Sequence, residues 1–219
     1  VLGQFNEIEG FYEENELYYV YCNQSPDLNA IFKNLSIQID QVSVEEIAKI
    51  NWNSVWESKF DEVIIDDFCR IFADFHPERT HKFQYEIIIN PKMSFGTGHH
   101  ATTEQMIRGM SSLDFNGKEV LDFGTGTGIL AILAEKMGAK RIDANDIEQF
   151  AWENTLENIK QNDCERIYVT HGELEQVPFR RYDIILANIN RNILIEYASA
   201  LRERLKSNGV CMLSGILEN

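Results

Sequence analysis

The chain has 219 residues and a formal net charge of −15 at pH 7, from 35 acidic and 20 Lys or Arg side chains. This acidity argues against nucleic acid as a direct partner, because such binding depends on neutralising phosphates, and it suits a basic protein partner. No apolar run approaches the ~20 residues of a membrane-spanning helix. We therefore expect a cytoplasmic monomer that contacts neither a membrane nor nucleic acid directly.

The N-terminal residues predict a small α+β module. Residues 17–22 are β-branched and aromatic and predict a strand, a Ser-Pro pair predicts a short helix at 26–34, and residues 36–42 alternate like a second strand. We interpret residues 1–42 as part of a compact module and residues 43–58 as a linker.

Residues 59–219 alternate between predicted strands and helices, which indicates an α/β domain with a doubly wound parallel sheet. Strands are expected at residues 63–66, 69–75, 84–90, 120–123, 141–145, 166–170, 182–187 and 210–216. Helices are expected at residues 104–112, 127–137, 149–161 and 192–205. The last strand would be an apolar exposed edge, so we expect further strands, absent from this sequence, to cover it.

The residues that commonly bind metals show no ligand spacing. The four cysteines, at positions 22, 69, 164 and 211, form no C-x-x-C pair, which favours reduced thiols. His99 and His100 are adjacent, so their side chains would diverge, and no paired carboxylates stand nearby. We expect no metal site.

The segment at residues 119–128, Glu-Val-Leu-Asp-Phe-Gly-Thr-Gly-Thr-Gly, predicts a buried strand that breaks into a glycine loop and enters a helix. Doubly wound sheets bind nucleotide-like cofactors at such a turn, where glycine lets the backbone approach the ligand. Gly124, Gly126 and Gly128 follow the spacing G-x-G-x-G, which differs from the dinucleotide fingerprint G-x-G-x-x-G.

Two carboxylates narrow the choice of cofactor. Asp122, just before the glycine loop, would repel a pyrophosphate but suits a ligand that carries an ammonium group. Asp146 ends the next predicted strand, where a carboxylate can accept both ribose hydroxyls. Together they favour S-adenosyl-L-methionine over a dinucleotide.

Two further polar residues follow predicted strands at the same edge of the sheet. Asn188 follows residues 182–187, and its carbonyl could accept a hydrogen bond from a substrate amine; the alternative is that it caps the next helix. Glu173 could reach the adenine amino group of the cofactor, or could be an ordinary surface glutamate.

Residues 93–103, Met-Ser-Phe-Gly-Thr-Gly-His-His-Ala-Thr-Thr, show no amphipathic period and are poor core material. Their composition favours a ligand-covering loop rather than an ordinary connecting loop.

Five segments carry a resemblance to a known family: residues 95–103, 120–131, 144–147, 187–189 and 213–217. In their order and spacing the sequence resembles the bacterial methyltransferases of large-subunit ribosomal protein eleven, a class I S-adenosylmethionine-dependent family. The resemblance extends over about residues 51–217.

That resemblance implies a Rossmann-like methyltransferase sheet that lacks its C-terminal strands here, preceded by part of a ferredoxin-like substrate-recognition module. It implies that Thr103, Gly124, Asp146 and Asn188 contact the cofactor, and it matches His100 to the histidine of the family's covering loop. We treat Asn188 and His100 as catalytic candidates. The implied reaction is methyl transfer to lysine side chains and the N-terminal α-amine of the ribosomal protein.

Three alternatives stay open. The methyl acceptor could be another protein or a small-molecule amine, the enzyme could be a dinucleotide-dependent oxidoreductase, or the chain could be a non-catalytic binding module. The Asn-Pro-Pro-Tyr signature of glutamine and base-amino methyltransferases is absent, because Ile189 and Asn190 follow Asn188.

Overall fold

The computed structural model describes residues 8–14, 17–22, 61–77, 80–90 and 100–215. The chain divides into two compact units, residues 1–51 and residues 52–219, each of which is described by itself.

In the first unit, β1 (Ile8–Glu14) and β2 (Leu17–Cys22) form an antiparallel hairpin. The strand predicted at residues 17–22 is confirmed, whereas β1 was not predicted. The helix expected at 26–34, the strand expected at 36–42 and the linker lie outside the described residues. The hairpin is compatible with the expected module, and the proposed domain boundaries stay a prediction.

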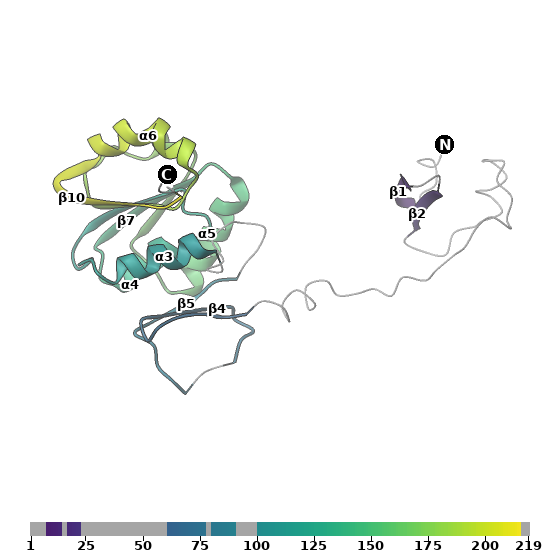
Figure 1. Ribbon diagram of the computed structural model, residues 1–219, viewed down its shortest axis with the longest axis horizontal. Coiled ribbons are helices and arrows are strands. Elements are labelled where there is room, and N and C mark those ends of the chain that lie inside the picture. Colours follow the sequence, from purple (N-terminus) through teal and green to yellow (C-terminus); the bar gives the residue numbers. More distant parts are fainter. Residues whose placement is uncertain (1–7, 15–16, 23–60, 78–79, 91–99, 216–219) are drawn as a thin grey trace, which may run out of the picture. The chain divides into compact units, whose positions relative to one another are not determined.

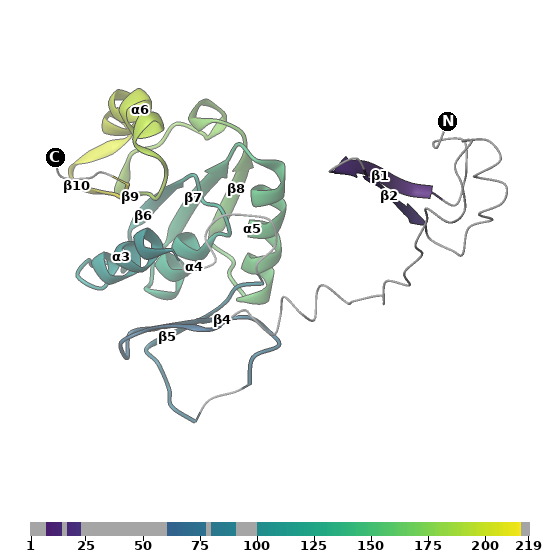
Figure 2. The same cartoon turned by 45° about the vertical axis from the view of Figure 1, so that its right-hand side comes forward.

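A five-stranded parallel sheet forms the centre of the second unit. Its strands are β6 (Glu119–Phe123), β7 (Arg141–Asp146), β8 (Ile167–His171), β9 (Tyr182–Ala187) and β10 (Leu205–Leu213). Figure 2 shows them in the order β10-β9-β6-β7-β8, which confirms the doubly wound α/β fold. Strands β7 and β8 are added on one side of β6, and β9 and β10 are then added on its other side. The order of strands therefore reverses between β6 and β9, and the ligand crevice of such a fold lies at the carboxyl ends of these two strands.

Helices cover both faces of this sheet, as Figure 1 shows. The helices are α3 (Ala101–Met110), α4 (Ile129–Lys136), α5 (Gln149–Gln161) and α6 (Arg191–Glu203). Apolar residues of α3, α4 and α5 share one buried cluster with the sheet, and α6 packs on the other face through Leu194 and Leu201. Within the described ranges, no helix has the length and apolar character needed to cross a membrane.

A second, three-stranded sheet packs against α3 and α4 from the side opposite the central sheet. It consists of β3 (Val63–Ile65), β4 (Cys69–Phe72) and β5 (Tyr85–Ile88), with β4 antiparallel to β3 and parallel to β5. All three strands were predicted, but their separation into a sheet of their own was not, because pairing depends on contacts that local patterns do not reveal.

Several predicted boundaries were wrong for identifiable reasons. Helix α3 begins at Ala101, three residues before the predicted start, because His100 caps it. Helix α4 begins at Ile129, two residues after the predicted start, because Gly128 has a φ of 83° and cannot lie within a right-handed helix. Strand β10 begins at Leu205, five residues before the predicted start, because Leu205 pairs with Tyr182 ahead of a register shift that precedes Val210.

Candidate active site

The glycine loop leaves β6 through backbone conformations that favour glycine. The φ angles are 74° at Gly124, 59° at Gly126 and 83° at Gly128. The amides of Gly124 and Thr125 both donate to the carbonyl of Asn145, at 3.0 and 2.9 Å, so the loop closes over the end of β7. A Cβ on Gly124 would lie only 2.3 Å from Cγ2 of Ile189, which leaves no room for a side chain there.

Asp122 lies beneath this loop and is 1% exposed. The Thr125 hydroxyl donates to its Oδ2 at 2.6 Å, while its Oδ1 is buried with no hydrogen-bond partner among the described residues. Burial raises the pKa of Asp122 to about 7 against the opposing effect of hydrogen bonding from the Thr125 hydroxyl and the Ala131 backbone N–H, and the nearby charge of Asp146 adds to the rise. An unpaired buried carboxylate oxygen is a position that a cationic ligand group would satisfy.

Asp146, the last residue of β7, is tied to the loop. Its Oδ2 accepts the Gly126 N–H at 2.9 Å, and its Oδ1 accepts the Glu148 N–H at 3.0 Å. Each carboxylate oxygen can accept a second hydrogen bond, so the group is held in place and still able to accept from two neighbouring hydroxyls. Asp122 and Asp146 therefore both hydrogen-bond to residues of the glycine loop, and their predicted contacts with the cofactor stay predictions.

Asn188, which follows β9, is held by two hydroxyl groups. Its Nδ2 donates to Oγ1 of Thr103 at 3.0 Å, and the Ser214 hydroxyl donates to its Oδ1. Thr103 is fully buried in α3, so this bond joins residues 85 positions apart in the chain. The contact of each residue with the cofactor, which the family resemblance implies, stays a prediction. The alternative that Asn188 caps the next helix is wrong, because the cap of α6 is Asn190, which accepts the Ile193 N–H at 3.1 Å.

Ser214 was not among the predicted site residues. It follows β10, and its own N–H donates to the Ala187 carbonyl at 3.1 Å, which brings it beside the end of β9. A signal for it exists in the sequence, because Ser214 lies near the carboxyl end of the strand predicted at residues 210–216, at the same edge of the sheet as Asn188.

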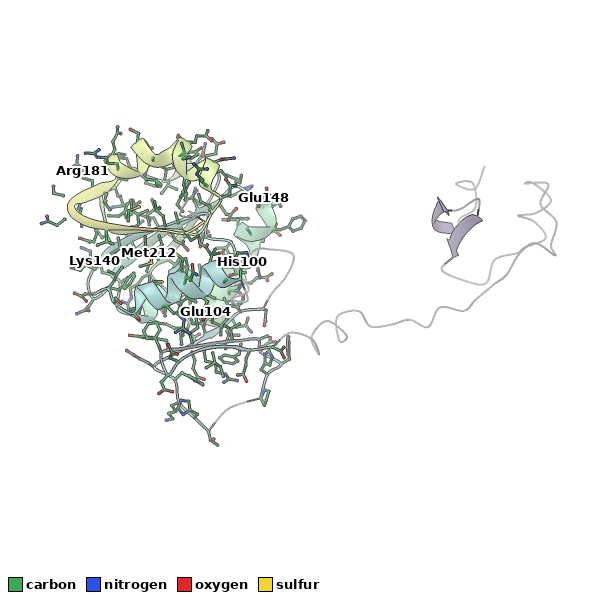
Figure 3. All side chains as sticks on the ribbon, in the orientation of Figure 1. His100, Glu104, Lys140, Glu148, Arg181 and Met212 are labelled. Atoms are coloured by element: carbon green, nitrogen blue, oxygen red, sulfur yellow. The ribbon has the colours of Figure 1, made fainter. Side chains whose placement is uncertain are left out.

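His100 caps the first turn of α3. Its Nδ1 lies 2.7 Å from Thr102 Oγ1 and accepts the Thr102 N–H at 3.3 Å, and the side chain is exposed. Figure 3 shows His100 and Glu148 at one end of the unit, with Lys140 and Arg181, which lie at or just before the starts of β7 and β9, at the other. The rest of the expected covering loop, residues 93–99, lies outside the described residues.

Glu173 is the N-cap of the short 3-10 helix at Leu174–Gln176 and is exposed. The backbone before it is fixed beside Asp146: the Gly172 N–H donates to the Asp146 carbonyl at 2.8 Å, and Asn145 Nδ2 donates to the Gly172 carbonyl at 3.0 Å. The residue therefore follows β8 next to the predicted ribose-binding carboxylate, and its contact with adenine stays a prediction.

The described residues thus gather one set of polar groups around the carboxyl ends of β6, β7 and β9. Its members are Thr103, Asp122, Gly124, Gly126, Asp146 and Asn188. A cavity of about 210 Å³ lies at the opposite, amino end of the sheet, where Lys118, Asp183 and Asn208 line it, and it includes none of this set. Among the described residues, no three His, Cys, Asp or Glu side chains are arranged to hold a metal ion.

This set fits a ligand that carries an ammonium group and a ribose. The unpaired Asp122 Oδ1 can accept from the ammonium, and Asp146 can accept from the ribose hydroxyls. The absence of a side chain on Gly124 lets Ile189 pack against the loop.

Comparisons with known proteins identify the family of the chain. A family model described as "Ribosomal protein L11 methyltransferase (PrmA)" matches residues 3–219. A ribosomal protein L11 methyltransferase of Porphyromonas gingivalis is 46% identical over 179 residues, which is 80% of this chain and 61% of the relative. One of Chlorobaculum tepidum is 37% identical over 99% of this chain and 78% of its own length.

The structure of the ribosomal protein L11 methylase of Lactobacillus delbrueckii subsp. bulgaricus is similar with a TM-score of 0.63 and 31% sequence identity. The similarity covers 71% of this chain and 80% of that one. The chain spans only about three-fifths of its Porphyromonas gingivalis relative, so it represents part of that protein's length. By sequence and by fold, the chain belongs to the ribosomal protein L11 methyltransferase family.

Proposed function

We propose that this protein transfers methyl groups from S-adenosylmethionine to amines of ribosomal protein L11, namely lysine side chains and the N-terminal α-amine. The observation that carries the proposal is the Asn188 amide, held by Thr103 and Ser214 beside the glycine loop. The family of the chain and the names of its relatives support the choice of substrate.

The cofactor would be held by the chain's own groups as follows. Asp122 would face its ammonium, Asp146 its ribose hydroxyls and Glu173 its adenine amino group, while Gly124 and Gly126 would let it lie close to the backbone. When bound, S-adenosylmethionine supplies an electrophilic methyl group on a sulfonium.

Asn188 would orient the substrate. Its Oδ1 accepts from Ser214 and has a second lone pair, which can accept an N–H of the incoming amine and direct the nitrogen lone pair at the methyl group. The amine must be neutral to react, and a free lysine has a pKa near ~10.4. Exclusion of water from the closed site would lower that pKa, so orientation and desolvation are the chain's main contributions.

His100 is the second catalytic candidate. Its Nδ1 already interacts with Thr102, so any proton transfer to substrate would have to use Nε2. We place its contribution after that of Asn188, because capping α3 by itself accounts for a hydrogen-bonding side chain at this position.

We further propose that the protein acts as a monomer in the cytoplasm, on a basic ribosomal protein and without contacting nucleic acid directly. The net charge of −15 supports this choice, because an acidic protein attracts a basic substrate and repels phosphate.

Incubation with methyl-labelled S-adenosylmethionine and an unmethylated ribosomal extract tests the proposal. Label in the L11 band, lost in Asn188→Ala, is the expected result. Label confined to another protein or to a small-molecule amine would move the function to that acceptor. Equilibrium dialysis in which NAD(H) is retained and S-adenosylmethionine is not would instead favour the oxidoreductase.

A further inference from the structure

Helix α5 presents a row of buried amides to two neighbouring segments. Asn154, Asn158 and Asn162 recur every four residues, so they share one face of the helix. Asn154 and Asn158 are fully buried and Asn162 is 8% exposed. Polar groups so deeply buried need hydrogen-bond partners, and the partners of these amides reveal their role.

One set of partners lies on β5 and on the two residues that extend it, 89 and 90. Asn162 exchanges two hydrogen bonds with Ile88, accepting its N–H at 3.0 Å and donating to its carbonyl at 2.7 Å. One turn earlier along α5, Asn158 Oδ1 accepts the Asn90 N–H at 3.2 Å, and Asn154 Nδ2 donates to the Asn90 carbonyl at 3.1 Å. The side chains thus bond to alternate residues of the chain, as a neighbouring strand would.

The other set of partners lies in the glycine loop. Asn158 Nδ2 donates to the Thr127 carbonyl at 2.9 Å, and the Thr155 hydroxyl donates to the Gly126 carbonyl at 2.8 Å. Asn158 therefore bonds to the glycine loop with its nitrogen and to the extension of β5 with its oxygen. Because one partner is a carbonyl and the other an N–H, only this orientation of the amide satisfies both.

We infer that Asn158 is a positioning residue that sets the geometry of the glycine loop and, through it, the affinity for S-adenosylmethionine. The inference rests on the cofactor binding of the proposed function and assigns that binding a residue outside the predicted site. The loop turns through three glycines with positive φ, which have little intrinsic conformational preference. Fixing its carbonyls from α5 orders the loop before the ligand binds, and preorganisation of this kind raises affinity.

Asn158→Asp tests the inference because it keeps the shape of the side chain and replaces the donor. When ionised, the introduced carboxylate directs an oxygen at the Thr127 carbonyl. When protonated, it can donate to that carbonyl as the amide does. The nearby ionisable groups that contact either segment, Asp74 on Asn90 and Asp122 and Asp146 at the loop, are acids, so burial and their charges raise the pKa of the introduced carboxyl.

Two variants of α5 provide controls. Asn162→Asp makes the same change one turn away, where the nitrogen donates to the carbonyls of Ile88 and Asn158. It should reduce stability and leave cofactor affinity unchanged. Thr155→Val keeps the side-chain shape and removes the donor to Gly126, so it should reduce cofactor affinity without changing a bond to β5.

The measurement is calorimetric titration with S-adenosylhomocysteine between pH 5.5 and 8, with thermal unfolding to verify that each variant is folded. Relative to the native protein at the same pH, we expect Asn158→Asp to bind about tenfold more weakly at pH 8, the effect of one lost hydrogen bond. The loss should shrink at pH 5.5.

Native-like affinity of Asn158→Asp at pH 8, or an equal loss in Asn162→Asp, would overturn the inference. If Asn158→Asp does not fold, Thr155→Val decides, and native-like affinity of that variant would overturn the inference. A native protein that does not bind S-adenosylhomocysteine would instead contradict the proposed function, and the inference with it.

Discussion

Replacement of Asp122 by asparagine tests the predicted contact between this carboxyl and the cofactor ammonium. In the ligand-free protein, burial raises the pKa of Asp122 from an ordinary 3.8 to about 7. A cation placed against the unpaired Oδ1 favours the ionised form and lowers that pKa again. Ligand binding below pH 7 should therefore release a proton from Asp122.

The magnitude follows from the pKa. A group with a pKa near 7 is about nine-tenths protonated at pH 6 and about one-tenth protonated at pH 8, so binding should release up to about 0.9 and about 0.1 protons respectively. The amide introduced by Asp122→Asn carries no charge to pair with the ammonium, and hydrogen bonds to charged groups contribute roughly 1.5–3 kcal/mol. We expect Asp122→Asn to weaken S-adenosylhomocysteine binding about ten- to hundredfold at pH 8.

Titration calorimetry in buffers of different ionisation enthalpy counts the protons released. Asp122→Asn should lose the release, while Glu148→Gln, which removes an exposed carboxylate near the site, should retain it. The reasoning is refuted if native protein releases no proton at pH 6, or if Asp122→Asn binds as tightly as native protein.

The same pKa shift predicts that the stability of the ligand-free protein falls as the pH rises from about 4 to about 7. In this range the Asp122 carboxyl is protonated in the folded state and ionised in the unfolded state.

Two further substitutions test residues that shape the site. Gly124→Ala would place a Cβ 2.3 Å from Ile189 at a residue whose φ is 74°. Urea unfolding should therefore show a decrease of at least about 1–2 kcal/mol in the free energy of unfolding, and an unchanged midpoint would contradict the close packing. Ser214→Ala frees one side of the Asn188 amide, so kcat should fall several-fold while S-adenosylhomocysteine affinity changes less, and Ser214→Thr should restore part of the rate. Equal kcat in Ser214→Ala and native protein would remove Ser214 from the site.

Sequence patterns could place the residues whose positions follow from strand ends. Asp122, Asp146 and Asn188 each lie at or next to the carboxyl end of an apolar strand, and the sheet order brings those ends together. Local rules alone could not distinguish Asn188 from Asn190 as the helix cap, because both are asparagines near a helix start and only the three-dimensional partners differ.

Features that depend on nonlocal partners were missed. The spacing of Asn154, Asn158 and Asn162 is visible in the sequence, but their bonds to Ile88, Asn90 and Thr127 join segments far apart in the chain. Strand β1 escaped prediction because Gly10 and its glutamates interrupt the kind of continuous β-branched and aromatic run that predicts its partner β2.

The most direct test of the account is methyl transfer to purified, unmethylated ribosomal protein L11. The complete protein is incubated with S-adenosylmethionine and L11, and peptide mass spectrometry then locates each added methyl group. The account predicts methylation of lysine side chains and of the N-terminal α-amine by native protein, and loss of both in Asn188→Ala. Unmodified L11 in the presence of native protein that binds S-adenosylhomocysteine, or full methylation by Asn188→Ala, would contradict it.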